Sequence, residues 1–237
     1  LIGVLAWLGR FYLIRYKPDW TGRIGLFGWA VGDGKVPGLH ERMDAMADHI
    51  VATIEKEKPD EALIVGHSIG TTLATLVGSR VLKRRPELGA AGSPLALATL
   101  GQVHSLVGLM PQSDWFREEL AHYASFPDFT WVDITAPPDG ACYVMVDPLE
   151  FMTGPRPANL PRLINAQFYK TFSPERVEQG RADRMLMHFF YIQSPDHPQL
   201  DTDLYDFIAM IAGPKTLGER FGGRAGATKP FYRKEAA

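Results

Sequence analysis

A serine between two glycines is the feature of this sequence that most directly indicates chemistry. Gly66-His67-Ser68-Ile69-Gly70 matches the pattern G-x-S-x-G. In this pattern a sharp, strained turn can hold a serine hydroxyl clear of the backbone as a nucleophile, and the glycines leave room for the two flanking segments to approach. The Ile69 N–H opens the following segment, where it could stabilise an oxyanion. The alternative is a structural serine in a buried turn.

The elements on either side of the turn favour the nucleophile. Ala62–Val65 is an apolar run with β-branched residues, long enough for a buried strand and too short for a helix. Thr71 to about Arg84 is predicted to be a helix. Before the strand, Leu39–Lys56 is predicted to be an amphipathic helix with its apolar residues on one face: Leu39, Met43, Met46, Ile50 and Ile54.

The rest of the chain continues the alternation of strands and helices. We expect strands at Leu95–Leu100, Phe129–Ile134 and Arg162–Phe168, and helices at Asp114–Ser125 and from Ser173 to about Gln193. Arg23–Trp29 is expected to be a strand or tight loop, Gly32–Gly38 and the proline-rich Gly154–Pro161 to be loops, and Leu204–Gly213 to pack on the sheet. This order predicts an α/β fold with a doubly wound, mostly parallel sheet and helices on both faces.

The strand, the Gly-Ser-Gly turn and the helix together resemble the nucleophile elbow of the α/β-hydrolase superfamily. Within that superfamily the chain is similar to a group of uncharacterised bacterial proteins with upstream membrane segments, from about Trp20 to about Phe221. The resemblance implies a three-layer sandwich and a serine hydrolase that acts on a carboxylic ester, including lipid and acyl esters. Two alternatives stay open, a catalytically silent scaffold or regulator tethered to a membrane and an acyltransferase on the same fold.

The acid of such an enzyme is expected after the nucleophile, at the carboxyl end of a later strand. Asp139 meets this condition, in the loop Thr135–Gly140 that follows the strand at 129–134. Asp133 lies inside that strand and Asp147 in a later turn. The alternative for Asp139 is a turn-forming role before Gly140.

Only His188 and His197 follow the proposed acid, so the base is expected to be one of them. His197 lies in a loop, which suits an exposed base, whereas His188 lies in an apolar run where a core histidine is usual. The resemblance favours His188, because the similar proteins carry a His-Phe pair there and often arginine at position 197. We therefore expect a triad of Ser68, His188 and Asp139, with His197 as the alternate base. His104 is expected to be a loop histidine with its hydrogen bonds satisfied.

The second donor of the oxyanion hole is not evident in the sequence. The hole usually takes one N–H from the residue after the serine, here Ile69, and another from an HGGG-type loop. No such motif is present, so Gly28-Trp29 or a segment preceding Leu1 would have to supply it.

The composition limits the partners. The 237 residues carry a formal net charge of -2, which argues against nucleic acid because there is no basic excess to neutralise phosphates. No group of cysteines and histidines has zinc-ligand spacing, and no cofactor motif is present, so we expect neither metal nor cofactor. The single Cys142 fits a reducing compartment, hence the cytoplasm.

The N-terminal segment, residues 1–19, is the part of the chain that could contact a membrane. Its apolar run is short of the roughly 20 residues that span a bilayer. It is expected to be either a core or interfacial helix or the end of a membrane segment, with Arg10, Arg15 and Lys17 marking the cytoplasmic side of the inner membrane. Residues 20–221 are expected to form the α/β domain and residues 222–237 a flexible tail.

Overall fold

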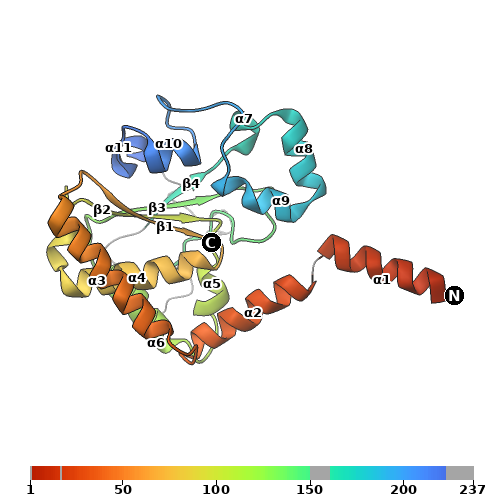
Figure 1. Ribbon diagram of the computed structural model, residues 1–237, viewed down its shortest axis with the longest axis horizontal. Helices are drawn as coiled ribbons and strands as arrows, with labels where there is room; N and C mark the ends of the chain where they lie inside the picture. The colour runs from red at the N-terminus through yellow and green to blue at the C-terminus, as the bar shows by residue number, and fades with distance from the viewer. Residues whose placement is uncertain (1, 17, 150–160, 223–237) are drawn as a thin grey trace, which may run out of the picture.

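The computed structural model describes residues 2–16, 18–149 and 161–222, and its centre is a parallel sheet (Figure 1). The strands are β1 (Ala62–His67), β2 (Leu95–Leu100), β3 (Thr130–Thr135) and β4 (Arg162–Asn165), in the order β1-β2-β3-β4. This confirms the predicted α/β class and parallel pairing. β4 ends three residues earlier than predicted, because Phe168 already begins a helix. The described strands lack the reversal of strand order that defines a doubly wound sheet.

Backbone hydrogen bonds continue the sheet past the carboxyl ends of its strands. The N–H of Ser68 donates to Leu100 O at 2.9 Å, and the N–H of Gly101 donates to Ile134 O at 2.8 Å. Each connecting segment is therefore fixed to the neighbouring strand at its first residue. β2 is buried along its whole length, whereas β1 is half-buried, with Val65 36% exposed. The strand predicted at Ala62–Val65 is thus present as β1, but it is half-buried and lies at an edge of the sheet that the described strands form.

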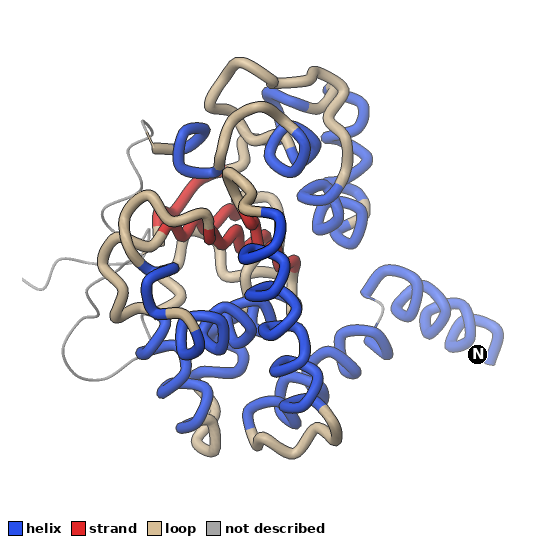
Figure 2. The backbone as a smooth tube through the Cα atoms, turned by 60° about the vertical axis from the view of Figure 1, so that its left-hand side comes forward, coloured by secondary structure: helices blue, strands red, loops and turns tan. Residues whose placement is uncertain are grey.

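One face of the sheet is covered by the helix that precedes β1 and by the helices that connect the first three strands (Figures 1 and 2). These are α3 (Leu39–Glu57), α4 (Gly70–Arg84), the 3-10 turn η1 (Pro86–Gly89), α5 (His104–Gly108) and α6 (Asp114–Tyr123). The predicted helices at 39–56, 71–84 and 114–125 are confirmed. Met46 does not join the apolar face of α3 as expected and is 56% exposed, whereas Met43 and Ile54 are buried.

The opposite face is covered by the elements after β4 (Figure 1). They are α7 (Phe168–Thr171), α8 (Pro174–Ala182), α9 (Arg184–His188), the 3-10 turn η2 (Phe189–Ile192), α10 (Phe207–Ala212) and α11 (Leu217–Phe221). Ala209 and Met210 of α10 are buried, which agrees with the predicted packing of that segment. Apart from Pro161 and Gly222, the predicted loop at Gly154–Pro161 and the predicted tail lie outside the described residues.

The single helix predicted from Ser173 to Gln193 is wrong, because the chain leaves the helix at Asp183. Its start is as expected, since the Ser173 side chain accepts a hydrogen bond from Arg176 N. Asp183 has extended backbone angles, and its carboxylate accepts from Met185 N at 2.9 Å and from Leu186 N. Aspartate is a strong N-cap residue, so it ends α8 and begins a new helix. His188 consequently lies at the end of the five-residue α9.

The strand or tight loop predicted at Arg23–Trp29 is also wrong, because these residues belong to helix α2 (Pro18–Gly32). Proline at the first helical position is compatible with the helix. The sequence favours Gly25 and Gly28 as loop formers, but both are helical, and Gly28 lies against Leu106 and Ile69, where a Cβ would come within 3.2 and 3.8 Å of their side chains. Gly28 therefore permits close packing of the helix, whereas a Cβ on Gly25 would meet nothing within 4 Å. The loop expected at 32–38 is present after α2.

Helix α1 (Ile2–Tyr16) precedes α2 and extends away from the sheet (Figure 1). Its apolar side chains between Val4 and Leu13 are between 48 and 63% exposed: Val4, Leu5, Trp7, Leu8, Phe11, Tyr12 and Leu13. The expectation of a core helix is therefore wrong, and the interfacial and membrane expectations stay predictions. None of the helices in the described part of the chain combines the length and apolarity needed to cross a bilayer.

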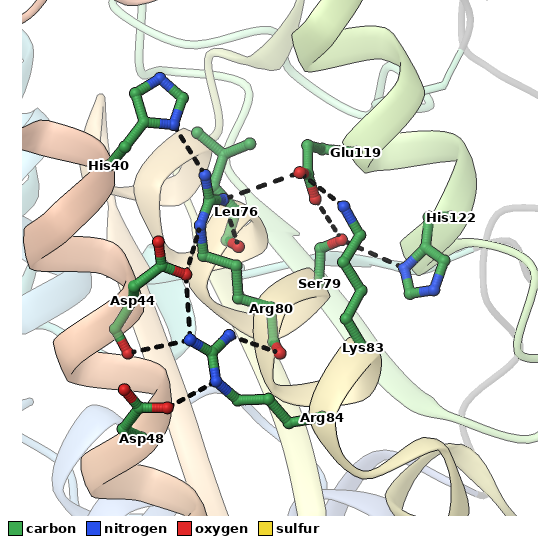
Figure 3. Close-up of polar contacts among 10 residues, drawn as sticks. All are labelled: His40, Asp44, Asp48, Leu76, Ser79, Arg80, Lys83, Arg84, Glu119 and His122. Atoms are coloured by element: carbon green, nitrogen blue, oxygen red, sulfur yellow. Dashed lines mark hydrogen bonds and ion pairs between the residues drawn. The ribbon is translucent and has the colours of Figure 1, made fainter.

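A polar network holds α4, the helix that follows Ser68, between α3 and α6 (Figure 3). The largely buried Arg80 contacts His40 Nδ1 at 3.0 Å and Asp44 at 3.4 Å, while Glu119 of α6 accepts from Lys83 at 2.6 Å. Burial raises the pKa of Glu119, but hydrogen bonds from Lys83 and Ser79 and the nearby positive charges outweigh it and lower that pKa. The carboxylate therefore stays ionised, and α4 is fixed on two sides.

Candidate active site

Ser68 occupies a strained turn between β1 and α4. Its φ angle is 56°, in the left-handed region that residues other than glycine rarely adopt, at a cost of about 1–3 kcal/mol. Besides the bond from Ser68 N to Leu100, the turn is held by Thr71, whose N–H and Oγ1 donate to Ser68 O at 2.9 and 2.6 Å. Strain of this kind persists only where the surroundings enforce it, and it is common at functional sites.

The two glycines of the pattern have different roles. A Cβ on Gly66 would lie 2.5 Å from Gly70 O and 2.7 Å from Thr71 Cα, which are backbone atoms that cannot move aside. Gly66 thus permits the close approach of strand and helix, as predicted. A Cβ on Gly70 would meet nothing within 4 Å, so the same expectation for Gly70 is wrong.

The structure brings together Asp139 and His188, two residues that lie 49 positions apart. His188 Nδ1 lies 2.8 Å from Asp139 Oδ2, and both side chains are fully shielded from solvent. The other carboxylate oxygen, Oδ1, accepts from Ala141 N at 2.9 Å, which fixes the plane of the carboxylate. Asp139 lies in the loop after β3, as predicted. It makes this turn as well as the contact with His188, and its role as the acid stays a prediction.

The charge state of this pair follows from its contacts. Burial raises the pKa of Asp139, but the hydrogen bond and charge of His188, the Ala141 N–H and Cys142 together lower it below its usual value. The carboxylate is therefore ionised and can only accept hydrogen bonds. Nδ1 of His188 must then carry a hydrogen, and in the neutral imidazole this tautomer has a lone pair on Nε2.

Nε2 of His188 is buried and has no hydrogen-bond partner within the described residues. A buried imidazole nitrogen without a partner is unfavourable unless a ligand or catalytic group uses it. His188 is adjacent to the turn, because its ring centroid is 4.7 Å from that of His67, the residue before Ser68. Within the described residues no hydrogen bond joins Ser68 Oγ to Nε2 of His188. Hydrogen bonds between nucleophile and base are often long in unliganded enzymes and shorten when substrate binds.

The N–H of Ile69, predicted to stabilise an oxyanion, lies at the turn. Ile69 directly precedes α4 and makes no backbone hydrogen bond through its N–H in the described part of the chain. Gly28 and Trp29, expected as a second donor, lie in the interior of α2, where the N–H groups are used by the helix itself. That expectation is wrong.

The other candidates from the sequence lie apart from this pair. His197 is exposed, and no hydrogen bond joins its ring to Asp139 or Ser68 within the described residues. Asp133 is buried in β3, where it accepts from Thr99 Oγ1 at 2.5 Å, and burial raises its pKa well above the usual value. His104 is buried in α5, not in a loop; as expected, its ring is satisfied, by Gln102 Oε1 at 3.1 Å and Thr75 Oγ1 at 2.9 Å.

His67 and the close approach of Gly101 to Asp139 were not identified from the sequence. His67 touches His188 directly, and its place next to Ser68 was a usable signal. Gly101 has a φ of 57°, and a Cβ there would come within 2.8 Å of the Tyr191 ring and 3.4 Å of Asp139 Oδ2. No local pattern reveals that contact, because it joins segments far apart in the chain.

No family model, curated protein or solved structure matches this chain. Within the described residues, no group of three or more histidine, cysteine, aspartate or glutamate side chains is arranged to hold a metal ion.

Proposed function

We propose that the protein is a serine hydrolase of the α/β-hydrolase type that cleaves carboxylic esters. The observation that carries this proposal is the buried Asp139–His188 pair, whose Nε2 is unpartnered within the described residues and whose imidazole contacts His67, the residue before a serine held at a φ of 56°. These residue types in this arrangement are those of a nucleophile, a base and an acid that orients the base.

The proposed reaction assigns one step to each group. Nε2 of His188 accepts the Ser68 hydroxyl proton as Oγ attacks the ester carbonyl carbon, and the Ile69 N–H stabilises the negative oxygen of the tetrahedral intermediate. The imidazolium, stabilised by Asp139, then protonates the departing alcohol. Water then attacks the carbonyl carbon of the acyl-enzyme while His188 accepts its proton. The bond to Ser68 Oγ breaks and His188 returns the proton to Oγ, which releases the acid and restores Ser68.

The order of the site residues along the chain supports the superfamily assignment. Ser68 follows β1, Asp139 follows β3 and His188 comes after β4, the order nucleophile, acid, base that α/β-hydrolases have. The helices on the two faces of the parallel sheet agree with a three-layer sandwich. Chymotrypsin- and subtilisin-type enzymes place the same groups in other orders.

The two alternative functions differ from ester hydrolysis in testable ways. A silent scaffold has no use for a polarised base, and the ionised Asp139 beside the buried His188 argues against it. An acyltransferase forms the same acyl-enzyme but passes the acyl group to an acceptor other than water. It is distinguished by a product that appears only when an alcohol or amine is added.

A cleft beside the base favours a substrate with an apolar portion. It has a volume of about 520 Å³ and lies between the start of α2 and α9 with η2. Trp20, Met185, Leu186 and Phe189 supply its apolar side chains, and Asp19, Asp183 and Gln193 lie at the same cleft. Phe189 follows His188 directly, so an acyl chain in this cleft would end near the imidazole. We therefore propose a lipid or other acyl ester as the substrate.

Replacing Asp139 with asparagine tests the proposal. The amide cannot stabilise an imidazolium and favours the wrong histidine tautomer, so kcat for a nitrophenyl ester should fall by about 10³–10⁴-fold. Turnover should be measured for esters from acetate to laurate, with the longer chains favoured in the wild type. The exposed Asp60, replaced by asparagine, is the matched control. If Asp139→Asn turns over esters as fast as this control, the proposed triad is incorrect.

We also propose that α1 contacts a lipid surface, because its apolar side chains are exposed on a helix that extends from the body. The double variant Trp7→Glu, Phe11→Glu should bind phosphatidylcholine–phosphatidylglycerol vesicles several-fold less well in a sedimentation assay, since charged side chains enter lipid poorly. Leu200→Glu, at an apolar residue 51% exposed in a loop, is the control. Equal binding of both variants would exclude α1 as the lipid contact.

A further inference from the structure

His67, between Gly66 and Ser68, makes contacts that the proposed reaction does not use. Its Nε2 lies 2.8 Å from the main-chain oxygen of His188. The two imidazole rings are also in contact, with centroids 4.7 Å apart, and the Phe189 ring is 5.5 Å from that of His67. The residue next to the nucleophile thus touches both the main chain and the ring of the proposed base.

The contact with a carbonyl oxygen determines which ring nitrogen of His67 carries the hydrogen. Burial lowers the pKa of His67 to about 4, and the neighbouring His188 lowers it as well, so the ring is neutral near pH 7. A carbonyl oxygen only accepts hydrogen bonds, so Nε2 of His67 carries the hydrogen and donates it. The nitrogen that faces His188 is therefore occupied by a donor bond and is not free to act as a base.

The accepting carbonyl lies at a junction between two helical segments. His188 is the last residue of α9 and the N-cap residue of η2, so its carbonyl also accepts the first hydrogen bond of that 3-10 turn. A carbonyl oxygen has two lone pairs, and His67 uses the second. Asp139 holds the imidazole through Nδ1, while His67 holds the backbone from which the imidazole projects. The two contacts together limit the movement of Nε2.

We propose that His67 is a positioning residue for the catalytic base. Its hydrogen bond to the His188 carbonyl ties the carboxyl end of β1, which carries Ser68, to the end of α9, which carries the imidazole. The inference rests on the proposed hydrolase function, and it assigns His67 no contact with the reacting atoms.

Two substitutions of similar size separate this role from simple packing. In His67→Gln the amide nitrogen can take the place of Nε2 and still donate to the carbonyl, whereas His67→Leu cannot donate. We expect His67→Gln to keep most of the wild-type kcat on a nitrophenyl ester. His67→Leu should lose about 10- to 100-fold in kcat with little change in KM, because displacement of a catalytic group by ~1 Å can cost about 100-fold. His49→Gln, at an exposed histidine of α3, is the control.

A second measurement does not depend on turnover. The hydrogen on His188 Nδ1, bonded to Asp139, should give a low-field proton NMR signal that disappears in His188→Gln. That signal should be retained in His67→Gln and should shift or broaden in His67→Leu. If the leucine variant does not fold, His67→Asn replaces it, because the asparagine side chain is too short to reach the carbonyl. If the wild type turns over no ester, the hydrolase proposal fails, but this signal still decides the role of His67. Equal kcat losses in the glutamine and leucine variants, or an unchanged signal in the variants that cannot donate, would overturn the inference.

Discussion

Replacing Ser68 with alanine is expected to abolish both ester turnover and labelling by a fluorophosphonate probe. The probe reacts with a serine only when a base removes its proton and donors stabilise the negative oxygen, so it reports the whole site. Removing the nucleophile of a triad can cost about 10⁶-fold in kcat. Alanine has the same backbone preferences as serine at a φ of 56°, so the turn should stay folded.

The labelling experiment has a matched control in the same chain. Ser125, an exposed serine after α6, donates to the main-chain oxygen of His122 and lies in a different segment from the turn. Ser125→Ala should label and turn over ester like the wild type. Labelling that persists in Ser68→Ala would place the reactive residue elsewhere and refute the assignment of Ser68.

The second large effect is expected at His188. His188→Ala should reduce turnover at least as strongly as Asp139→Asn, because Ser68 would lose the group that accepts its proton. His197→Ala should change turnover little, since His197 is exposed and no hydrogen bond joins its ring to Asp139 in the described part of the chain. Turnover should be measured per folded molecule, because removing a fully buried ring also leaves a cavity.

Other outcomes of the His188 and His197 substitutions would change the assignment of the base. Loss of turnover at position 197 with only lost stability at position 188 would make His197 the base. The intermediate variant His188→Gln fills more of the cavity than alanine and separates the two effects. If neither His188→Ala nor His197→Ala affects turnover, neither histidine is the base, and the protein is better interpreted as a catalytically silent scaffold than as an enzyme.

The fold could be predicted where local sequence determines local structure. The alternation of β-branched runs with amphipathic segments predicts each of the described strands and the helices at 39–57, 70–84 and 114–123, because the periodicity is read directly from the residues. The pairing of Asp139 with His188 was anticipated from chain order and resemblance, while the distance between them depends on how the whole sheet is assembled.

The features that could not be predicted depend on tertiary contacts. Gly28 of α2 has the sequence signature of a loop residue, and only its tertiary neighbours Leu106 and Ile69 show that it permits close packing of a helix. Asp183 could equally have been an exposed residue within a helix, and its extended backbone is decided by the packing of α8 and α9. The position of His67 beside Ser68 is visible in the sequence, but its contact with the His188 carbonyl is not, because that partner is 121 residues away in the chain.

The strand order of the sheet has a consequence for how the chain can fold during synthesis. Each strand pairs with the one made immediately before it, as in Ala62 with Leu95, Ala96 with Thr130 and Val132 with Arg162. No described strand has to wait for a later segment to be inserted between two earlier ones. The sheet can grow in the direction in which the ribosome delivers it, by closing loops of similar length. His188 emerges after β4 and is then the last of the three proposed site residues to be synthesised. By that point the described strands can already be paired.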